Sequence, residues 1–232
     1  MKWLWLWLVG LFSVTPSPLP LPTAVPTALQ ELGEFLYGQA AVNDLSSLQL
    51  FSNLDEKQSA INLKQKYDCQ ILTSAGFYDT ENQHLGWFQV EGEEISPRQN
   101  NRLFDGFLSL VSGRVELGFQ SRPEAAYGLQ SGPMLIYDGK PLKLTIKDDQ
   151  PRRRVVAALT GDNQLIFMVI LSPDSNYAGP LLAETPKLVL GINQAITAAI
   201  NLDGGSASAF ISQDIALKEY SPIGGYFCYT KL

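Results

Sequence analysis

The sequence contains little histidine and little cysteine. Its 232 residues include one histidine, His84, and two cysteines. A protein-bound zinc ion takes three or four ligands, most often histidine and cysteine, and no such set is spaced along this chain. A serine hydrolase needs a base beside its nucleophile, and no Gly-x-Ser-x-Gly motif is present. The composition therefore disfavours both classes. It predicts no cofactor, and it leaves a carboxylate site for calcium or magnesium open without marking one.

Charged residues are also scarce. They make up 17% of the chain, and the formal net charge is −6. Nucleic acids and anionic membranes are bound mainly through basic surfaces, so this balance argues against both as partners. The run Arg152–Arg154 is an exception, but it is short and follows Asp148 and Asp149. We expect this run to cap or enter a strand, with one arginine turned toward a substrate anion.

The two cysteines, Cys69 and Cys228, permit one disulfide. In an exported protein this bond would join the early part of the core to the last strand. Two buried thiols in unrelated strands would serve equally well as small hydrophobic residues. The sequence leaves both alternatives open.

The N-terminal segment has the pattern of an export signal. Lys2 precedes an apolar run, Trp3–Val14, which is short for a membrane span. Five prolines between positions 16 and 26 then form an extended tether that a helix cannot cross. We expect residues 1–15 to act as a signal peptide or a retained anchor. The protein would then be periplasmic, secreted or anchored outside the cytoplasmic membrane, and would meet a membrane only through this segment.

The rest of the chain is interpreted as a linker and one domain. The apolar residues of Thr27–Leu36 share one helical face, which predicts a short helix within a Pro-rich linker over residues 16–60. Beyond it, β-rich runs alternate with turn residues, and Leu188–Thr197 has helical spacing. We predict an α+β fold: a single domain, residues 61–232, with a mixed β-sheet core and inserted helices. The expected strands are Cys69–Thr73, Leu85–Val90, Arg114–Phe119, Met134–Tyr137, Val155–Leu159, Leu165–Leu171, Ala198–Leu202, one at Phe210 and Tyr226–Thr230.

The segment Ala199–Ser208 carries the densest set of candidate site residues. An apolar run ends there on amide and carboxylate side chains, followed by two glycines and then serines. Glycine lets the backbone approach a ligand closely, and serine adds small donors and acceptors. A plain Asp-Gly-Gly turn between two strands would use the same residues without forming a site. The candidates are Asn201, Asp203, Gly204, Gly205, Ser206 and Ser208.

A second segment, Thr73–Asp79, has a similar composition. Small residues, Ser74 and Gly76 among them, lead to two aromatic residues and the carboxylate of Asp79. This order suits a strand end where a ligand packs against a ring, although Phe77 alone is more simply an anchor in the core. His84 follows shortly afterwards.

Several motifs follow one another in a fixed order along the chain. They are Ala75–Asp79, Gly132–Leu135 with Asp138-Gly139, Arg153 before a strand, and Asn201–Ser206. This order resembles the phosphodiester glycosidase family, over roughly Asn62 to the C-terminus. The Asn-Leu-Asp-Gly-Gly motif is the most specific part of the resemblance.

The resemblance implies an exported hydrolase that cleaves a sugar 1-phosphodiester, a sugar-phosphate or glycan substrate, into a sugar and a phosphomonoester. Reaction at an anomeric carbon generally uses two carboxylates, which makes Asp203 the first catalytic candidate and Asp79 the second. His84 would donate a proton. Arg153 would hold the diester. The other candidates for binding substrate are Gly204 and Gly205, whose N–H groups would form an anion nest, and Ser74, Gly76, Asn201, Ser206 and Ser208.

The chain also departs from the family pattern. Family members typically carry asparagine at the position of Ser74, threonine at Arg154 and a third glycine at Ser206. These differences fall on polar positions of the expected site. The alternative is therefore a non-catalytic sugar- or phosphate-binding envelope protein that keeps the fold, and a purely structural envelope protein comes third.

Overall fold

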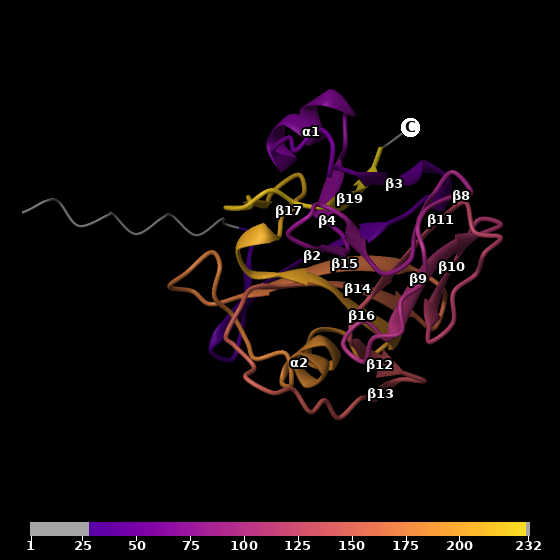
Figure 1. Cartoon of the computed structure of the whole chain (residues 1–232). Coiled ribbons are helices and arrows are strands. Elements are labelled where there is room, and N and C mark those ends of the chain that lie inside the picture. Colours follow the sequence, from indigo (N-terminus) through magenta and orange to yellow (C-terminus); the bar gives the residue numbers. More distant parts are fainter. Residues whose placement is uncertain (1–27, 231–232) are drawn as a thin grey trace, which may run out of the picture.

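The computed structural model describes residues 28–230, so the predicted export segment and the proline tether lie outside the described residues. The central element is a seven-stranded sheet (Figure 1). Its strands, in spatial order, are β1 (Gln30–Leu32), β2 (Phe35–Val42), β15 (Leu165–Leu171), β14 (Arg154–Thr160), β16 (Ile196–Gly204), β12 (Met134–Tyr137) and β13 (Lys140–Pro141).

Two five-stranded sheets and one hairpin complete the β-structure. The first sheet contains β10 (Arg114–Gly118), β9 (Gly106–Val111), β11 (Tyr127–Ser131), β7 (Phe88–Val90) and β8 (Glu93–Ser96). The second contains β18 (Ala216–Leu217), β17 (Phe210–Ile211), β4 (Ile71–Ser74), β19 (Gly225–Tyr229) and β3 (Leu48–Ser52). The hairpin pairs β5 (Phe77–Tyr78) with β6 (His84–Leu85).

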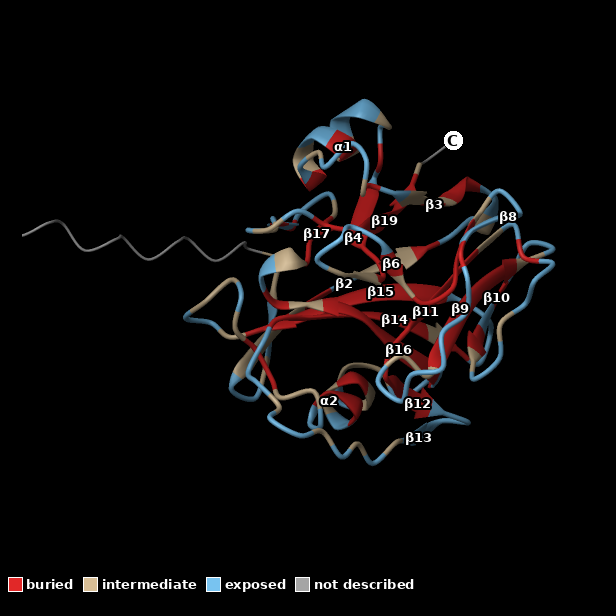
Figure 2. Ribbon diagram, in the orientation of Figure 1, coloured by how far each residue is buried: buried red, intermediate tan, exposed pale blue. Residues whose placement is uncertain are grey.

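The seven-stranded sheet is buried on both faces (Figure 2). Val155 and Val169 point into a core shared with the two five-stranded sheets. Their neighbours Val156 and Met168 point the other way and pack with Val189 of helix α2 (Thr185–Ile192). Because successive side chains in a strand alternate between faces, continuous apolar runs such as β15 fill both cores at once.

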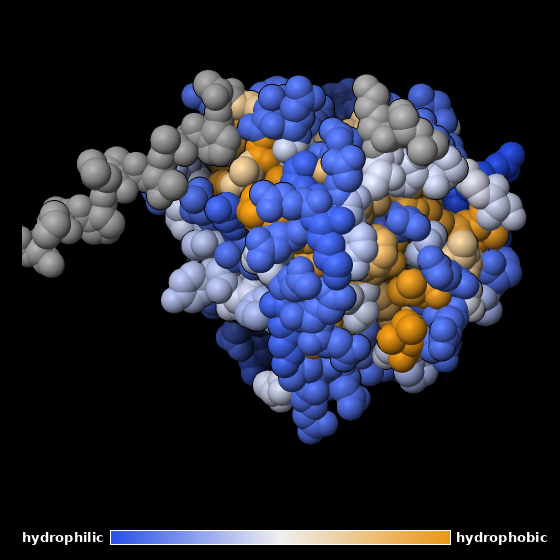
Figure 3. Space-filling model, turned by 90° about the horizontal axis from the view of Figure 1, so that it is seen from above, coloured by the Kyte–Doolittle hydropathy of each residue, from blue (hydrophilic) through white to orange (hydrophobic). Residues whose placement is uncertain are grey.

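Helix α1 (Ala60–Lys66) covers the outer face of the sheet that contains β4 and β19. Ala60 and Leu63 are buried in a small core there, and Lys66 is exposed. Seen from this side of the molecule, hydrophilic residues dominate the middle of the surface, with hydrophobic ones in patches beside them (Figure 3). Within residues 28–230, no helix is long and apolar enough to cross a membrane.

The predicted α+β class is wrong, because the molecule is mostly β. The described residues form two α-helices, and every strand pair among them is antiparallel, so the sheets are not mixed. The helices lie on outer faces and do not alternate with the strands of one sheet (Figure 1). The predicted helix over Leu188–Thr197 begins earlier and ends at Ile192, where β16 follows after a short turn.

The helix predicted over Thr27–Leu36 is also wrong. Its described part forms β1 and the start of β2, which pair as a hairpin through the turn at Gly33 and Glu34. Gly33 has φ of +63°, a backbone angle that glycine adopts without strain. Strands β2 and β3 then pair with β15 and β19, so the segment expected to be a linker contributes strands to two sheets.

Cys69 and Cys228 form a disulfide, which resolves the alternative that the sequence left open. Their Cα atoms are 5.3 Å apart, although 159 positions separate them in sequence. The bond joins the residues before β4 to β19, beneath helix α1. The early and late parts of the chain are thus linked covalently within one small core.

Candidate functional site

A β-bulge near the end of β16 turns two polar side chains onto opposite faces of the seven-stranded sheet. Asn201 pairs with Val156 and Asp203 with Val155, so Leu202 is an extra residue in the ladder. Directly paired residues share a face. Asn201 therefore faces the α2 side, and Asp203 faces the core between the sheets. Without the bulge, residues two apart would point the same way.

Asp203 lies in a cleft of about 580 Å³ between the end of β16 and the β5–β6 hairpin, which we name the Asp203 cleft. Tyr78 lies close to the carboxylate, since burial and then the charge of Asp203 raise the pKa of its phenol. The Tyr78 hydroxyl donates to the carbonyl oxygen of Pro222 at 2.5 Å, which fixes the ring. The other residues lining the cleft include Gly76, Phe77, Asp79, Arg152 and Gly204.

The carboxyl group of Asp203 is buried, with 6% of the residue exposed. Burial raises its pKa from 3.8 to about 7, because removal from water disfavours the charged form. The backbone N–H of Gly204 donates to Oδ1 at 2.6 Å and lowers the pKa. Contacts with the Ser74 hydroxyl and the charge of Arg153 lower it further, but burial dominates. A carboxyl group of this kind exchanges a proton near neutral pH.

A second cleft, of about 270 Å³, lies on the opposite face of the sheet and includes Asn201; we name it the Asn201 cleft. The Asn201 Nδ2 group donates to the carbonyl oxygen of Gly132 at 2.9 Å. Its Oδ1 atom is buried and accepts no hydrogen bond from the described residues. A buried acceptor without a partner is costly, so this atom is a candidate for binding a ligand donor.

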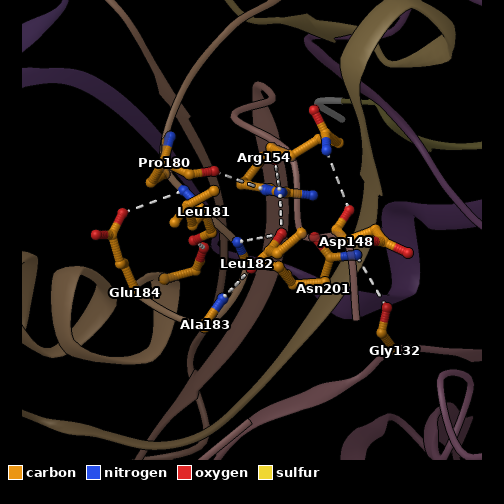
Figure 4. A network of polar contacts seen from close by, with 12 residues as sticks. Gly132, Asp148, Arg154, Pro180, Leu181, Leu182, Ala183, Glu184 and Asn201 are labelled. Carbon is orange, nitrogen blue, oxygen red and sulfur yellow. Dashed lines mark hydrogen bonds and ion pairs between the residues drawn. The ribbon is translucent and has the colours of Figure 1, made fainter. Parts of the chain in front are cut away.

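Arg154 lies beside Asn201 in this cleft and is held by a network of polar contacts (Figure 4). Its Nε donates to Pro180 O at 3.1 Å, and its Nη2 donates to Gln150 O at 2.7 Å and to Asp149 Oδ1 at 3.3 Å. No described residue accepts a hydrogen bond from Nη1. Burial lowers the pKa of Arg154 to about 10, so it remains charged at neutral pH. One donor of a fixed cation thus stays free.

The two clefts meet at the end of the sheet. Phe77, Arg152 and Gly204 line both of them. Arg152 is exposed, and its side chain lies against Gly205, where a Cβ would come within 3.5 Å of Nη1. Gly204 has no room for a side chain, because a Cβ there would lie 2.7 Å from the carbonyl oxygen of Arg153. The junction of the two clefts thus carries the exposed cation of Arg152.

Four of the residues singled out in the sequence line the Asp203 cleft together: Gly76, Asp79, Asp203 and Gly204. One carboxylate oxygen of Asp79 is used in the hairpin turn: Oδ1 accepts the backbone N–H groups of Glu81 and Gln83, both at 2.9 Å. Its second oxygen carries no hydrogen bond from the described residues.

Arg153 and Ser208 line neither cleft, and both are fully buried. Nε of Arg153 donates to the Ser208 hydroxyl at 2.9 Å, and Nη1 donates to Asn176 O at 2.8 Å. Nη2 donates to the carbonyl oxygens of Ser208 and Lys218. Each guanidinium nitrogen is thus used to join three chain segments behind the site.

The N–H groups expected to form an anion nest are also used internally. Gly204 N–H donates to Asp203, and Gly205 N–H donates to Arg153 O at 2.9 Å. Ser206 is exposed, and its carbonyl oxygen accepts the N–H groups of Tyr220 and Ser221. Ser74 lies behind Asp203, fully buried, and its hydroxyl also accepts the N–H of Ala209 at 3.0 Å. This loop supports the carboxylate and offers a ligand little of its own.

His84 lies outside both clefts and is 4% exposed. Its ring stacks on Phe88 with the centroids 3.7 Å apart, and Nε2 is 2.9 Å from the Ser52 hydroxyl. Burial lowers the pKa of His84 to about 4, so the ring is neutral in ordinary buffers. In this position His84 packs the core beneath the hairpin.

Sequence reasoning missed several residues of the clefts. Arg152 was grouped with its neighbours, Tyr78 was noted only as an aromatic, and Phe104 was not considered. The alternation of side chains along a strand could have separated Arg152 and Arg154 from Arg153, had the first residue of β14 been known. Among residues 28–230, no three His, Cys, Asp or Glu side chains gather as a metal site would require.

Known structures with similar folds include three of interest. The catalytic domain of zebrafish N-acetylglucosamine-1-phosphodiester alpha-N-acetylglucosaminidase, auto-inhibited by its pro-peptide, matches with a TM-score of 0.63 and 13% identity, over 91% of this chain and 86% of that one. A hypothetical protein from Synechocystis matches with a TM-score of 0.58 and 13% identity, over 86% of this chain and 60% of that one. A putative exported protein from Burkholderia pseudomallei matches with a TM-score of 0.57 and 10% identity, over 85% and 74%. At these identities the likeness shows the fold.

The sequence itself matches a family model, while no curated protein matches it closely. The matched region, residues 67–225, includes the β5–β6 hairpin, both clefts and the whole of β16. The model is that of the phosphodiester glycosidases, which confirms the resemblance found in the order of the sequence motifs. The chain belongs to the phosphodiester glycosidase family.

Proposed function

We propose that this protein hydrolyses the bond between C1 of a sugar and a phosphodiester oxygen, and that the reaction takes place in the Asp203 cleft. The observation that carries this proposal is the Asp203 carboxyl itself, buried at the end of β16, open to a cleft and with a pKa of about 7. A group that titrates near the working pH transfers protons most effectively. Membership of the family supports the choice of substrate class.

Asp203 acts in this proposal as a general base. The departing group is a phosphomonoester, whose second pKa is about 6, so it leaves without needing a proton. The attacking water does need to lose one. As the C1–O bond breaks, its electron pair stays on the phosphate oxygen, the water oxygen bonds to C1, and the ionised Asp203 takes the water proton. Asp79, which lines the same cleft, donates no proton in this step; it stabilises the positive charge that develops at C1 as the C1–O bond breaks.

Arg152 binds the phosphate in this proposal. It is exposed at the junction of the clefts, while the guanidinium of Arg153 is enclosed. An arginine binds phosphate oxygens through paired N–H donors. Arg152 and Asp203 line the same cleft of about 580 Å³, which gives a diester room next to the carboxylate. Arg152 takes the role that sequence reasoning gave to Arg153.

The test is hydrolysis of sugar 1-phosphodiesters in ¹⁸O-labelled water. If C1–O cleavage occurs, the label enters the sugar and is absent from the phosphomonoester. We expect Asp203→Asn to lower kcat/KM about 10²- to 10⁴-fold. Asp214→Asn is the matched control, because Asp214 is exposed and lines neither cleft. Label in the phosphate, or full activity in Asp203→Asn, would contradict the mechanism.

A folded wild-type domain that binds sugar phosphates without turning them over would instead support the non-catalytic binding protein. Several site residues are used internally, among them Arg153 and the N–H groups of Gly204 and Gly205, which is the observation that favours this second candidate. The two candidates differ in one result, since only an enzyme consumes the diester.

We also propose that the protein is exported, as the apolar N-terminal run suggests. The Cys69–Cys228 disulfide supports this, because such bonds persist mainly in oxidising compartments. Fractionation of cells that express the full chain tests it: protein confined to the cytoplasm, with both thiols reduced, would contradict export.

A further inference from the structure

The proposed reaction uses Asp203 and Arg152 and gives no role to the residues that line only the Asn201 cleft. It nevertheless contains two groups set for a ligand: the buried Oδ1 of Asn201, which accepts no hydrogen bond, and Nη1 of Arg154, which donates none to the described residues. Asn201 is 2% exposed, and its Nδ2 bond to Gly132 fixes the direction of Oδ1. An acceptor and a donor that have no partner among the described residues therefore belong to residues lining the same cleft.

The walls of this cleft are largely apolar. Phe77 and Phe104 stack with their ring centroids 4.8 Å apart, and Ile146 and Leu182 line it as well. Asp149 and Arg154 form an ion pair in this cleft at 3.3 Å, so their charges balance. Asp149 also accepts two backbone N–H groups at the start of the turn before α2. A ring with an apolar face and no net charge suits such walls.

The Asn201 cleft adjoins the reaction site. Phe77, Arg152 and Gly204 line both clefts, and the bulge in β16 turns Asn201 and Asp203 to opposite faces of the sheet end. A phosphodiester has two arms. If the sugar arm lies by Asp203 and the phosphate by Arg152, the second arm extends into the Asn201 cleft.

We propose that the Asn201 cleft binds the alcohol arm of the diester, and that this arm is an uncharged ring with an apolar face and a hydroxyl or N–H group. That group donates to Asn201 Oδ1, and a ring or ester oxygen accepts from Arg154 Nη1. The inference rests on the proposed function for the assignment of the two arms. Asn201 and Arg154 then determine which leaving group the protein accepts.

Binding of the product monoester tests the proposal without turnover. The probes are trans-4-hydroxycyclohexyl phosphate, cyclohexyl phosphate and methyl phosphate, and their binding to the full-length protein with its disulfide intact is measured by calorimetry. We expect the hydroxycyclohexyl ester to bind at least about tenfold more tightly than either of the others. Equal affinity for all three would overturn the proposal.

Two variants place the probe in the cleft. Ile146→Trp fills the Asn201 cleft and should weaken binding of the hydroxycyclohexyl ester at least about tenfold, with methyl phosphate unaffected. Ile95→Trp is the control, because Ile95 is half exposed on β8 and lines neither cleft. An equal loss in both variants would contradict the assigned cleft.

The same ligands and variants distinguish a failure of this inference from a failure of the proposed function. If the diesters are not hydrolysed but the ring monoester binds and Ile146→Trp abolishes its preference, the reaction is wrong and the ligand site stands. If the diesters are hydrolysed and the leaving-group ring makes no difference to KM in wild type or Ile146→Trp, the reaction stands and the subsite is wrong.

Discussion

At the scale of single residues, the pKa of Asp203 sets the expected pH dependence. As a general base it must be ionised, and burial raises its pKa to about 7. We predict that kcat/KM rises about tenfold per pH unit below pH 7 and becomes level above it. A profile that instead falls above pH 7 would make Asp203 a general acid. His84 should not change the pH profile of kcat/KM near neutral pH, because burial lowers the pKa of His84 to about 4.

Two adjacent arginines should behave in opposite ways. Arg153 is buried with all three nitrogens hydrogen-bonded, so Arg153→Met leaves buried carbonyl oxygens unpaired and should cost about 3 kcal/mol or more of unfolding free energy. Arg152→Met should leave stability within about 0.5 kcal/mol and raise KM for the diester. Urea denaturation and steady-state kinetics on the pair measure both effects. If Arg153→Met does not fold, Arg153→Lys provides the stability measurement, and unchanged stability there would refute the structural role.

The sequence predicted that Asp203 lies at a strand end, but it did not predict which residues surround it. A polar residue at the end of an apolar run followed by glycines predicts a strand-end site, and Asp203 lies at such a point. Which face Asn201 occupies depends on one extra residue in the ladder, and a bulge leaves no mark in hydrophobic periodicity. The separation of Arg152 and Arg153 depends likewise on the register of β14.

At the scale of elements, strands with apolar runs were predictable and short paired segments were not. Met134–Tyr137 and Leu165–Leu171 have the predicted bounds, since each is an uninterrupted apolar run bounded by turn residues. The residues of β1 and β2 have apolar positions three and four apart, which also fits a helix. Pairing of β2 with all seven positions of β15 outweighs that local preference.

The turn before α2 depends on one carboxylate. Asp149 accepts the N–H groups of Leu182 and Ala183 at 3.1 and 2.9 Å and pairs with Arg154. Asp149→Ala removes all three contacts and leaves a buried guanidinium without its partner. We predict a loss of about 2–4 kcal/mol of unfolding free energy, together with weaker binding in the Asn201 cleft.

The neighbouring carboxylate provides the control for that prediction. Asp148 is exposed and its side chain makes no ion pair with the described residues, so Asp148→Ala should change stability by no more than about 0.5 kcal/mol. Equal effects in the two variants, measured by urea denaturation, would show that the turn does not depend on Asp149.

At the scale of the whole molecule, the predicted class failed because the described residues are mostly strands and form only two short α-helices. The helix predicted over Leu188–Thr197 overlaps α2 only at residues 188–192, and spacing does not tell whether a helix is inserted between paired strands or lies on an outer face. The strand order of the central sheet joins segments that lie far apart in the sequence, β2 beside β15 and β12 beside β16. Long-range pairing of this kind follows from packing of the complete core and not from local sequence.

The disulfide constrains these distant segments, and its removal should lower stability more than any single surface change. Cross-linking residues 159 positions apart restricts the unfolded chain strongly, and chain entropy predicts a contribution of at most about 5 kcal/mol. The double variant Cys69→Ala, Cys228→Ala should therefore unfold at lower urea concentration than the oxidised wild type. Reductant should shift the wild type to nearly the same midpoint and leave the variant unchanged. Neither cysteine lines the Asp203 cleft or the Asn201 cleft, so the kinetic constants of the folded variant should match those of the wild type. An unchanged midpoint would mean that the bond adds nothing to the core beneath α1, and lost activity in the folded variant would mean that the bond positions the site.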